Sequence, residues 1–175
     1  MRLRQGVLLM QQGDRPQAGA PVPHRQNNDG EVPAPPAAVK RVLFLCTGNA
    51  CRSQLAEALA NHYYGDRLNA VSAGTSPAGV HPRAVAVLAE LGINWSQARS
   101  KNVSEFVGQK FDQVITLCGQ AQQACPLFPG KTERLHWGLP DLAAVTGSEE
   151  EIMTAFRAVR DELREKLAQQ FGNSK

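Results

Sequence analysis

The eight residues from Cys46 to Ser53 combine side chains that could bind and attack a tetrahedral oxyanion. They read Cys-Thr-Gly-Asn-Ala-Cys-Arg-Ser. A cysteine thiolate is a strong nucleophile, so we predict that Cys46 is the catalytic nucleophile. The guanidinium of Arg52 can hold two oxyanion oxygens at once. Gly48 and Asn49 tolerate the positive φ angles of a tight loop, and the Ser53 hydroxyl could donate to the Cys46 sulfur. The predicted oxyanion-binding residues are Thr47, Gly48, Asn49, Ala50, Cys51, Arg52 and Ser53.

This segment joins a predicted strand to a predicted helix. The apolar run 42–45 is typical of a strand buried on both faces, and the residues from 53 to 64 have helical spacing. Backbone N–H groups at a helix start lack internal partners, and the helix dipole adds positive charge there. Such a site favours an oxyanion and the thiolate of Cys46. A buried cysteine is common, but chance does not explain why this motif falls at a strand-to-helix junction.

The rest of the chain alternates strands and helices. Further strands are predicted near 69–73, 111–117 and 134–137, and helices over 82–91 and from 148 to the C-terminus. Ser148 and Glu151 form a capping box at the start of the last helix. This alternation predicts an α/β fold, a three-layer sandwich with a four-stranded parallel sheet covered on both faces.

The first 39 residues differ from the remainder. They contain six of the eleven prolines, and no two large apolar residues are adjacent after Met10. Such a segment buries too little surface to offset the entropy of ordering it. We therefore predict a disordered tail, or an over-long start, at residues 1–39 and a single domain at residues 40–175.

Composition excludes several classes of protein. The net charge of +3 comes without a Lys/Arg run, which gives no indication of nucleic acid binding. No apolar stretch approaches the ~20 residues of a membrane span, and the apolar run at 6–10 is too short for a secretory signal. We expect a cytoplasmic protein whose four cysteines are reduced and more often catalytic or redox-active than paired.

Two later cysteines could take part in the same chemistry. Cys118 follows the predicted strand at 111–117, and parallel strands open onto one crevice at their carboxyl ends. Its thiol therefore plausibly faces Cys46, with Cys125 nearby in a polar, Gly/Gln-rich segment. Alone, each would more simply be a core or loop residue, whereas with Cys46 they could form a thiol relay. We interpret Cys51 as structural, with a protective or regulatory disulfide as the lesser alternative.

The segment from Cys46 to Glu57 closely resembles the phosphate-binding loop of arsenate reductases built on the low-molecular-weight tyrosine phosphatase fold. The resemblance continues through Ser-Ala-Gly at 72–74, Val-Ile-Thr-Leu-Cys at 114–118 and His-Trp-Gly at 136–138, and it covers residues 40–171. It implies reduction of arsenate to arsenite, arsenic detoxification, a final Cys118–Cys125 disulfide, and thioredoxin as the reductant. No bound cofactor is required.

The resemblance also assigns a general acid and raises the question of a metal. Asp141 matches the acid that protonates the leaving oxygen, although Leu142 follows it where the family often has proline. One branch of the family binds potassium, and Asn49, Glu57 and Ser72 match its ligands. Lys101 replaces the acidic ligand expected there. A cation beside a cation site is unfavourable, so we predict no required metal and expect Lys101 to supply the charge.

Two other functions fit parts of this pattern. A phosphatase acting on phosphotyrosine or small phosphate esters would use Cys46, Arg52 and Asp141 without needing Cys118 or Cys125. A thiol-redox binding or sensor module would bind phosphate or zinc without turnover. The cysteine spacings are not a usual zinc pattern, however, and the four histidines show no ligand spacing.

Overall fold

The computed structural model describes residues 38–172, so the tail predicted at residues 1–39 falls almost entirely outside the described residues and its boundary stays a prediction. The elements in chain order are β1 (Lys40–Cys46), α1 (Arg52–Tyr64), β2 (Leu68–Gly74), α2 (Pro82–Ala89), the 3₁₀ turn η1 (Val103–Phe106), β3 (Gln113–Thr116), α3 (Gly119–Gln123), β4 (Glu133–His136), the 3₁₀ turn η2 (Leu142–Ala144) and α4 (Glu149–Phe171).

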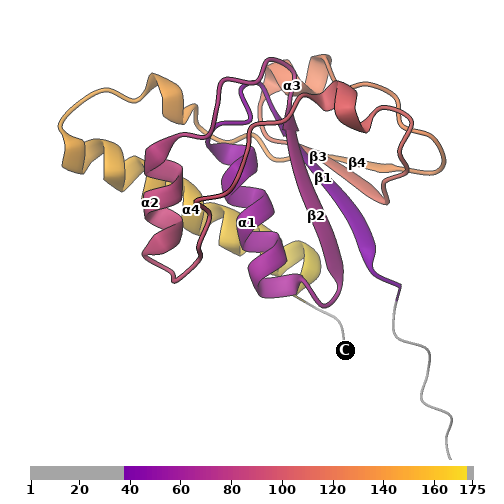
Figure 1. Cartoon of the computed structure of the whole chain (residues 1–175), viewed down its shortest axis with the longest axis horizontal. Helices are drawn as coiled ribbons and strands as arrows, with labels where there is room; N and C mark the ends of the chain where they lie inside the picture. Colours follow the sequence, from indigo (N-terminus) through magenta and orange to yellow (C-terminus); the bar gives the residue numbers. More distant parts are fainter. Residues whose placement is uncertain (1–37, 173–175) are drawn as a thin grey trace, which may run out of the picture. The chain divides into compact units, whose positions relative to one another are not determined.

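The four strands form one parallel sheet in the order β2-β1-β3-β4 (Figure 1). The predicted four-stranded parallel sheet is confirmed. β1 lies in the middle, where Cys46 pairs with Gly74 of β2 and Leu45 pairs with Thr116 of β3. The chain leaves β1 toward β2 on one side and reaches β3 on the other. The carboxyl ends of these strands therefore surround a crevice, which is where open α/β sheets bind ligands.

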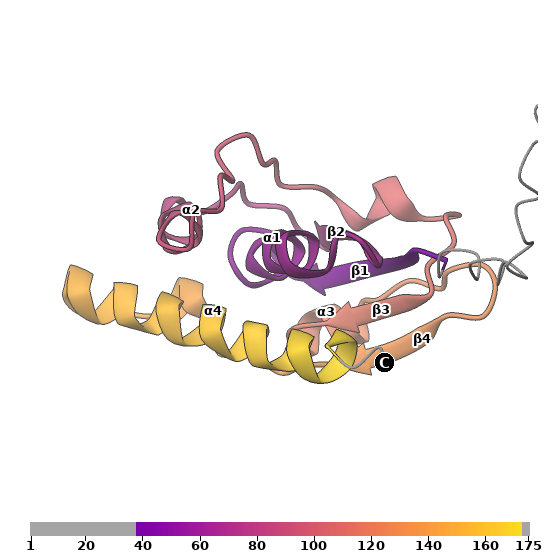
Figure 2. The same cartoon turned by 90° about the horizontal axis from the view of Figure 1, so that it is seen from below.

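The two faces of the sheet are covered unequally. Helices α1, α2 and α4 lie together on one side (Figures 1 and 2) and pack on side chains that include Val42, Phe44 and Ile115. The opposite face carries Leu43, Leu45 and Val114, and it is covered by α3, η1 and Phe128. Residues 42–45 of β1 are fully buried, as the continuous apolar run predicts, because the strand is enclosed from both sides.

The ends of several elements follow from local chemistry. The predicted capping box of α4 is present, with Ser148 Oγ accepting from the Glu151 N–H and Glu151 reaching back to the Ser148 N–H. The apolar stripe of α4 is buried at Phe156, Leu163 and Leu167, among others. Neither η1 nor η2 nor α3 was predicted, because turns of three to five residues are too short to show a helical period.

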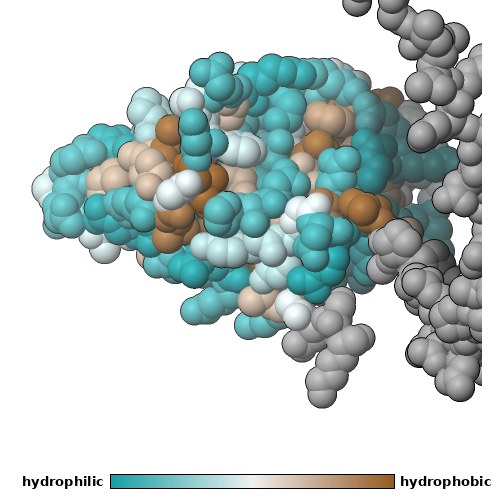
Figure 3. Space-filling model, turned by 60° about the horizontal axis from the view of Figure 1, so that its bottom comes forward, coloured by the Kyte–Doolittle hydropathy of each residue, from teal (hydrophilic) through white to brown (hydrophobic). Residues whose placement is uncertain are grey.

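Hydrophobic side chains are largely enclosed in the described part of the chain. The face seen in Figure 3 is mostly hydrophilic, with hydrophobic residues gathered in small groups. The large apolar side chains that remain exposed are Val39, Tyr63, Val107 and Leu127. Between residues 38 and 172, no helix combines the length and the hydrophobicity needed to cross a membrane.

Candidate active site

The segment from Cys46 to Ser53 is a tight loop between β1 and α1. Cys46 is 2% exposed, and its sulfur lies 2.8 Å from Ser53 Oγ and 3.2 Å from the Asn49 nitrogen, whose N–H donates to it. Cys51 is the N-cap of α1 and offers no side-chain cap. The first N–H groups of α1 are therefore left free of a side-chain cap, as an oxyanion site requires.

Asn49 provides the unusual backbone conformation of the loop. Its φ angle of 44° makes it the one non-glycine residue with positive φ among residues 38–172. Gly48, which also tolerates positive φ, does not adopt it. Asparagine tolerates this left-handed region better than most residues do. Here its fully buried side chain donates to Ser53 Oγ at 2.8 Å and to Ser72 Oγ at 2.9 Å.

A cavity of about 300 Å³ opens over this loop. Arg52 is 9% exposed and donates to the Leu139 carbonyl and to Asp141 Oδ1, each at 3.3 Å. Asp141 is exposed and also caps η2 through Ala143. The structure thus brings the predicted nucleophile, guanidinium and acid to one cavity. Its lining residues are Cys46, Thr47, Gly48, Ala50, Cys51, Arg52, Ser76, Ala78, Gln120, Asp141 and Ala143. The two other predicted oxyanion-binding residues of the loop, Asn49 and Ser53, are fully buried and do not line this cavity.

Leu142, the residue at which the sequence departs from the resembled family, begins η2. Its side chain is 3% exposed and belongs to the main hydrophobic core. Core packing therefore holds the segment that carries Asp141.

Cys118 is the N-cap of α3 and lies next to the loop. Its sulfur is 3.4 Å from Thr47 Oγ1 and accepts from the Ala121 N–H at 3.4 Å. Burial by itself would raise the pKa of the Cys118 thiol. The hydrogen bonds with Thr47 and Ala121, together with the charge of Arg52, outweigh burial and lower that pKa below its ordinary value. Cys118 is therefore disposed to act as a nucleophile.

Cys125 lies away from the first cavity. It lines a second cavity of about 240 Å³ with Gln122, Arg134 and His136. Burial raises the pKa of the Cys125 thiol, and the charge of Arg134 offsets only part of that effect. All four cysteines are free thiols. The structure brings Cys118 to the loop but does not bring Cys125 to it.

Cys51 is a buried thiol whose pKa is raised. It is 6% exposed, and burial, followed by the neighbouring charge at Cys46, raises the pKa of its thiol to about 12. Its side chain nevertheless lines the first cavity. These properties agree with the interpretation of Cys51 as a structural residue.

Lys101 lies at the position where the resembled family led us to consider a potassium site. Its ammonium lies 3.0 Å from Glu57 Oε2, and both side chains are nearly buried. The same carboxylate oxygen accepts from the Ser72 hydroxyl. Asn49 Oδ1, a further matched ligand, accepts from the Lys101 N–H at 2.7 Å. These oxygens already accept hydrogen bonds from the ammonium and the backbone N–H of Lys101, so they do not fit a potassium ion. Among residues 38–172 no three His, Cys, Asp or Glu side chains cluster as a metal site.

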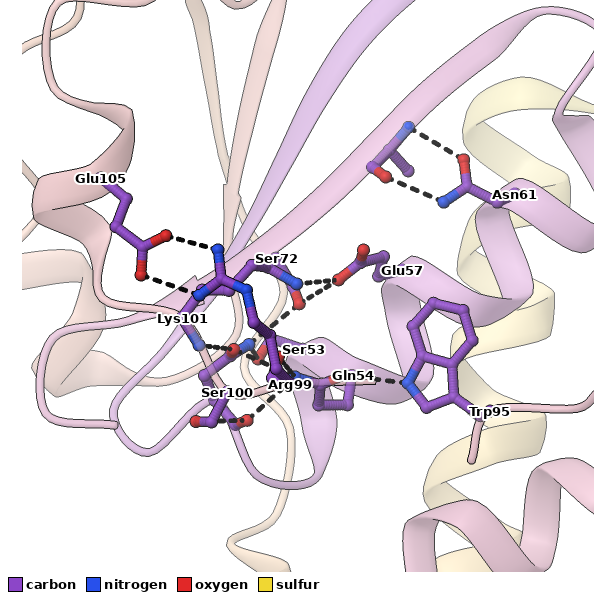
Figure 4. Close-up of polar contacts among 12 residues, drawn as sticks. Ser53, Gln54, Glu57, Asn61, Ser72, Trp95, Arg99, Ser100, Lys101 and Glu105 are labelled. Atoms are coloured by element: carbon purple, nitrogen blue, oxygen red, sulfur yellow. Dashed lines mark hydrogen bonds and ion pairs between the residues drawn. The ribbon is translucent and has the colours of Figure 1, made fainter. Parts of the chain in front are cut away.

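Several residues that support the loop were not predicted. Gly74 approaches it so closely that a Cβ atom would lie 2.5 Å from the Thr47 carbonyl oxygen and 2.8 Å from the Asn49 nitrogen. The side chains of Gln54 and Ser100 donate hydrogen bonds to Asn49 of the loop (Figure 4). Gly74 belonged to a recognised motif, but its close approach to the loop depends on strand register, which one sequence does not reveal.

Comparisons with known proteins agree with this architecture. A sequence model of the family described as low molecular weight phosphotyrosine protein phosphatase matches residues 41–174. The arsenate reductase of Halalkalibacterium halodurans is 44% identical over 128 residues, 73% of this chain and 92% of that protein. The thioredoxin-dependent arsenate reductase of Corynebacterium glutamicum has a solved structure with a TM-score of 0.55 and 35% identity, covering 81% of this chain and 67% of that one.

A further solved structure, of an arsenate reductase in the oxidized state, has a TM-score of 0.64 and 29% identity. The match covers 75% of this chain and 95% of that one. Sequence and structural similarity therefore extend over most of residues 38–172.

Replacing Gly74 with alanine should distort the loop. The added Cβ would meet two backbone atoms, which cannot rotate away, so we expect destabilisation of about 1–3 kcal/mol, typical of overpacking. Gly48→Ala is the matched control, because its Cβ would lie 3.6 Å from Ala78 Cβ, an ordinary contact. Thermal unfolding of both variants measures the difference. Equal melting temperatures would contradict the close approach of Gly74.

Proposed function

The chain belongs to the low molecular weight phosphotyrosine protein phosphatase family, and we propose that within this family it acts as an arsenate reductase. One observation carries the choice over a phosphatase: a second thiol, Cys118, lies beside the nucleophile loop with a lowered pKa. Hydrolysis of a phosphocysteine needs water but no second thiol. Reduction of arsenic needs two electrons, which a pair of thiols supplies.

The first step is attack of the Cys46 thiolate on arsenate. The oxyanion is held by backbone N–H groups of the loop and by Arg52. A sulfur–arsenic bond forms, one arsenic–oxygen bond breaks, and Asp141 protonates the departing oxygen so that it leaves as water. Asp141 lies 3.3 Å from Arg52 and lines the same cavity, which supports its proposed role as the acid.

The second step transfers electrons. The Cys118 thiolate attacks the Cys46 sulfur and forms a disulfide, the sulfur–arsenic bond breaks, and its electron pair stays on arsenic. Arsenic is thereby reduced from the pentavalent to the trivalent state and leaves as arsenite. Cys125 then attacks the Cys118 sulfur, which releases the Cys46 thiolate and leaves a Cys118–Cys125 disulfide. The three thiols therefore account for both electrons without a bound cofactor.

The final disulfide must be reduced by an outside dithiol. We propose thioredoxin, on the analogy of the Corynebacterium glutamicum relative whose reductase is thioredoxin-dependent. A relay that ends in a disulfide turns over only where reductants are abundant, so we also propose a cytoplasmic location. The phosphatase remains the second candidate, because it uses the same Cys46, Arg52 and Asp141.

Cys46→Ser should abolish both arsenate reduction and hydrolysis of p-nitrophenyl phosphate, because a serine hydroxyl is not ionised at neutral pH. NADPH consumption coupled through thioredoxin and its reductase measures the first reaction, with a reaction lacking arsenate as the control. Turnover by this variant clearly above the background in either assay would remove Cys46 from its proposed role.

Cys118→Ser and Cys125→Ser should both lose multiple turnovers of arsenate yet keep residual phosphatase activity. They should stop at different stages. Cys125→Ser releases about one arsenite per enzyme and accumulates a Cys46–Cys118 disulfide, whereas Cys118→Ser forms no disulfide. Mass spectrometry of proteolytic fragments separates these outcomes. Wild-type rates of arsenate turnover in both variants would instead favour the phosphatase.

Formation of the Cys118–Cys125 disulfide should unwind α3. Seven residues of helix span about 10.5 Å, and a disulfide tolerates a Cα separation of at most about 7 Å. Because α3 occupies Gly119–Gln123 between these thiols, amide hydrogen exchange across 119–125 should become faster on oxidation, while α4 stays protected. Identical exchange in the reduced and oxidised forms, with the disulfide verified by mass, would contradict the unwinding.

A further inference from the structure

Gln54 of α1 connects the oxyanion loop to a distant tryptophan. Its side chain is fully buried beneath the loop. The amide nitrogen donates to Asn49 Oδ1 at 3.0 Å, to the Asn49 carbonyl at 3.1 Å and to the Arg99 carbonyl at 3.0 Å. The amide oxygen accepts from the indole N–H of Trp95 at 2.9 Å (Figure 4). A hydrogen-bonded path thus runs from Trp95 through Gln54 to the loop.

Trp95 determines which way the Gln54 amide faces. The indole nitrogen is a donor only, so it requires the amide oxygen of Gln54 on its own side. The NH₂ group must then face Asn49. A reversed amide would place the Gln54 oxygen against two oxygens of Asn49 and its nitrogen against the indole N–H, and both contacts are repulsive. One tryptophan donor therefore orients the group that supports the loop.

Asn49 contacts the proposed nucleophile directly, as Ser53 does. Its left-handed backbone directs its N–H at the Cys46 sulfur. Gln54 bonds to both the side-chain oxygen and the backbone carbonyl of this residue. The remaining partners of the Asn49 side chain are the Lys101 N–H, Ser53 and Ser72. Loss of the Gln54 contacts would leave two buried oxygens of Asn49 with fewer donors and would free the peptide that carries the N–H.

We propose that Trp95 and Gln54 are positioning residues that keep the Asn49 N–H directed at Cys46 and so sustain the reactivity of its thiolate. The proposal rests on the proposed role of Cys46 as the nucleophile. Neither residue touches the substrate cavity. Trp95 is half-buried and lines a separate cavity of about 420 Å³, together with Arg99, Lys101 and four further residues that include Glu57 and Gln97.

The test compares Trp95→Phe with wild type in the full chain. Phenylalanine keeps an aromatic ring and removes the indole donor. The readout is the rate of iodoacetamide alkylation at Cys46, located by peptide mass spectrometry, at one fixed neutral pH. We expect a fall of about two- to tenfold, the range that one hydrogen bond contributes. Gln97→Ala, which alters the same cavity, should react at the wild-type rate. Thermal unfolding checks that all variants are folded.

A double-mutant cycle separates positioning from packing. Gln54→Leu alone should lower the alkylation rate at least as much as Trp95→Phe. In the Gln54→Leu background, Trp95→Phe should then change the rate by less than about twofold, because its effect passes through Gln54. If Gln54→Leu does not fold, Gln54→Met, which keeps an unbranched chain, replaces it.

Two results would overturn the positioning role of Trp95 and Gln54. The first is a wild-type alkylation rate in Trp95→Phe, and the second is an equal effect of that substitution with and without Gln54. A different result would identify failure of the proposed function. If wild-type Cys46 were no more reactive toward iodoacetamide than Cys125, whose thiol has a raised pKa, Cys46 would be excluded as the nucleophile. The positioning role of Trp95 and Gln54 would then be excluded as well.

Discussion

The site depends on one buried amide, the side chain of Asn49. It is fully enclosed, yet its oxygen accepts two hydrogen bonds and its nitrogen donates two. An unpaired polar group in such surroundings costs about 1–3 kcal/mol, so four satisfied bonds strongly favour one orientation. That orientation fixes the left-handed backbone at Asn49 and with it the N–H that reaches the Cys46 sulfur. Strands β1 and β2, helix α1 and residues 100–101 all contribute partners or close contacts.

Charge is arranged around this loop in two pairs with different surroundings. Arg52 lines the cavity, and its partner Asp141 is exposed to solvent. The Arg52 guanidinium can therefore turn to an incoming oxyanion at little cost. Lys101 and Glu57 lie behind the loop, both nearly buried. A buried pair is costly to break, because removing either partner leaves an uncompensated charge. The front pair is therefore suited to exchange with substrate, and the rear pair to holding the loop in place.

Much of this arrangement could be predicted from the sequence because its signals are local. The apolar run of β1, the loop motif and the start of α1 are adjacent in the chain, and parallel strands bring Cys118 to the same edge as Cys46. The supporting contacts could not be predicted in the same way. Gln54 and Trp95 are 41 positions apart, and no periodic pattern links a tryptophan donor to a glutamine amide. The distinction between Gly48 and Asn49 likewise depends on backbone geometry, since both residue types tolerate positive φ.

The two thiols of the proposed relay, Cys118 and Cys125, lie in different surroundings. The pKa of Cys118 is lowered while it lies against Thr47 and the Ala121 N–H, whereas burial raises the pKa of Cys125. Cys118 thus lies against Thr47 of the loop, whereas Cys125 lines a separate cavity. The Ala121 N–H that stabilises the Cys118 sulfur belongs to α3 itself. Unwinding of α3 would remove that hydrogen bond and expose Cys125 at the same time. In the proposed mechanism, α3 would thus favour the first attack by Cys118 and delay the attack by Cys125 until arsenic has been reduced.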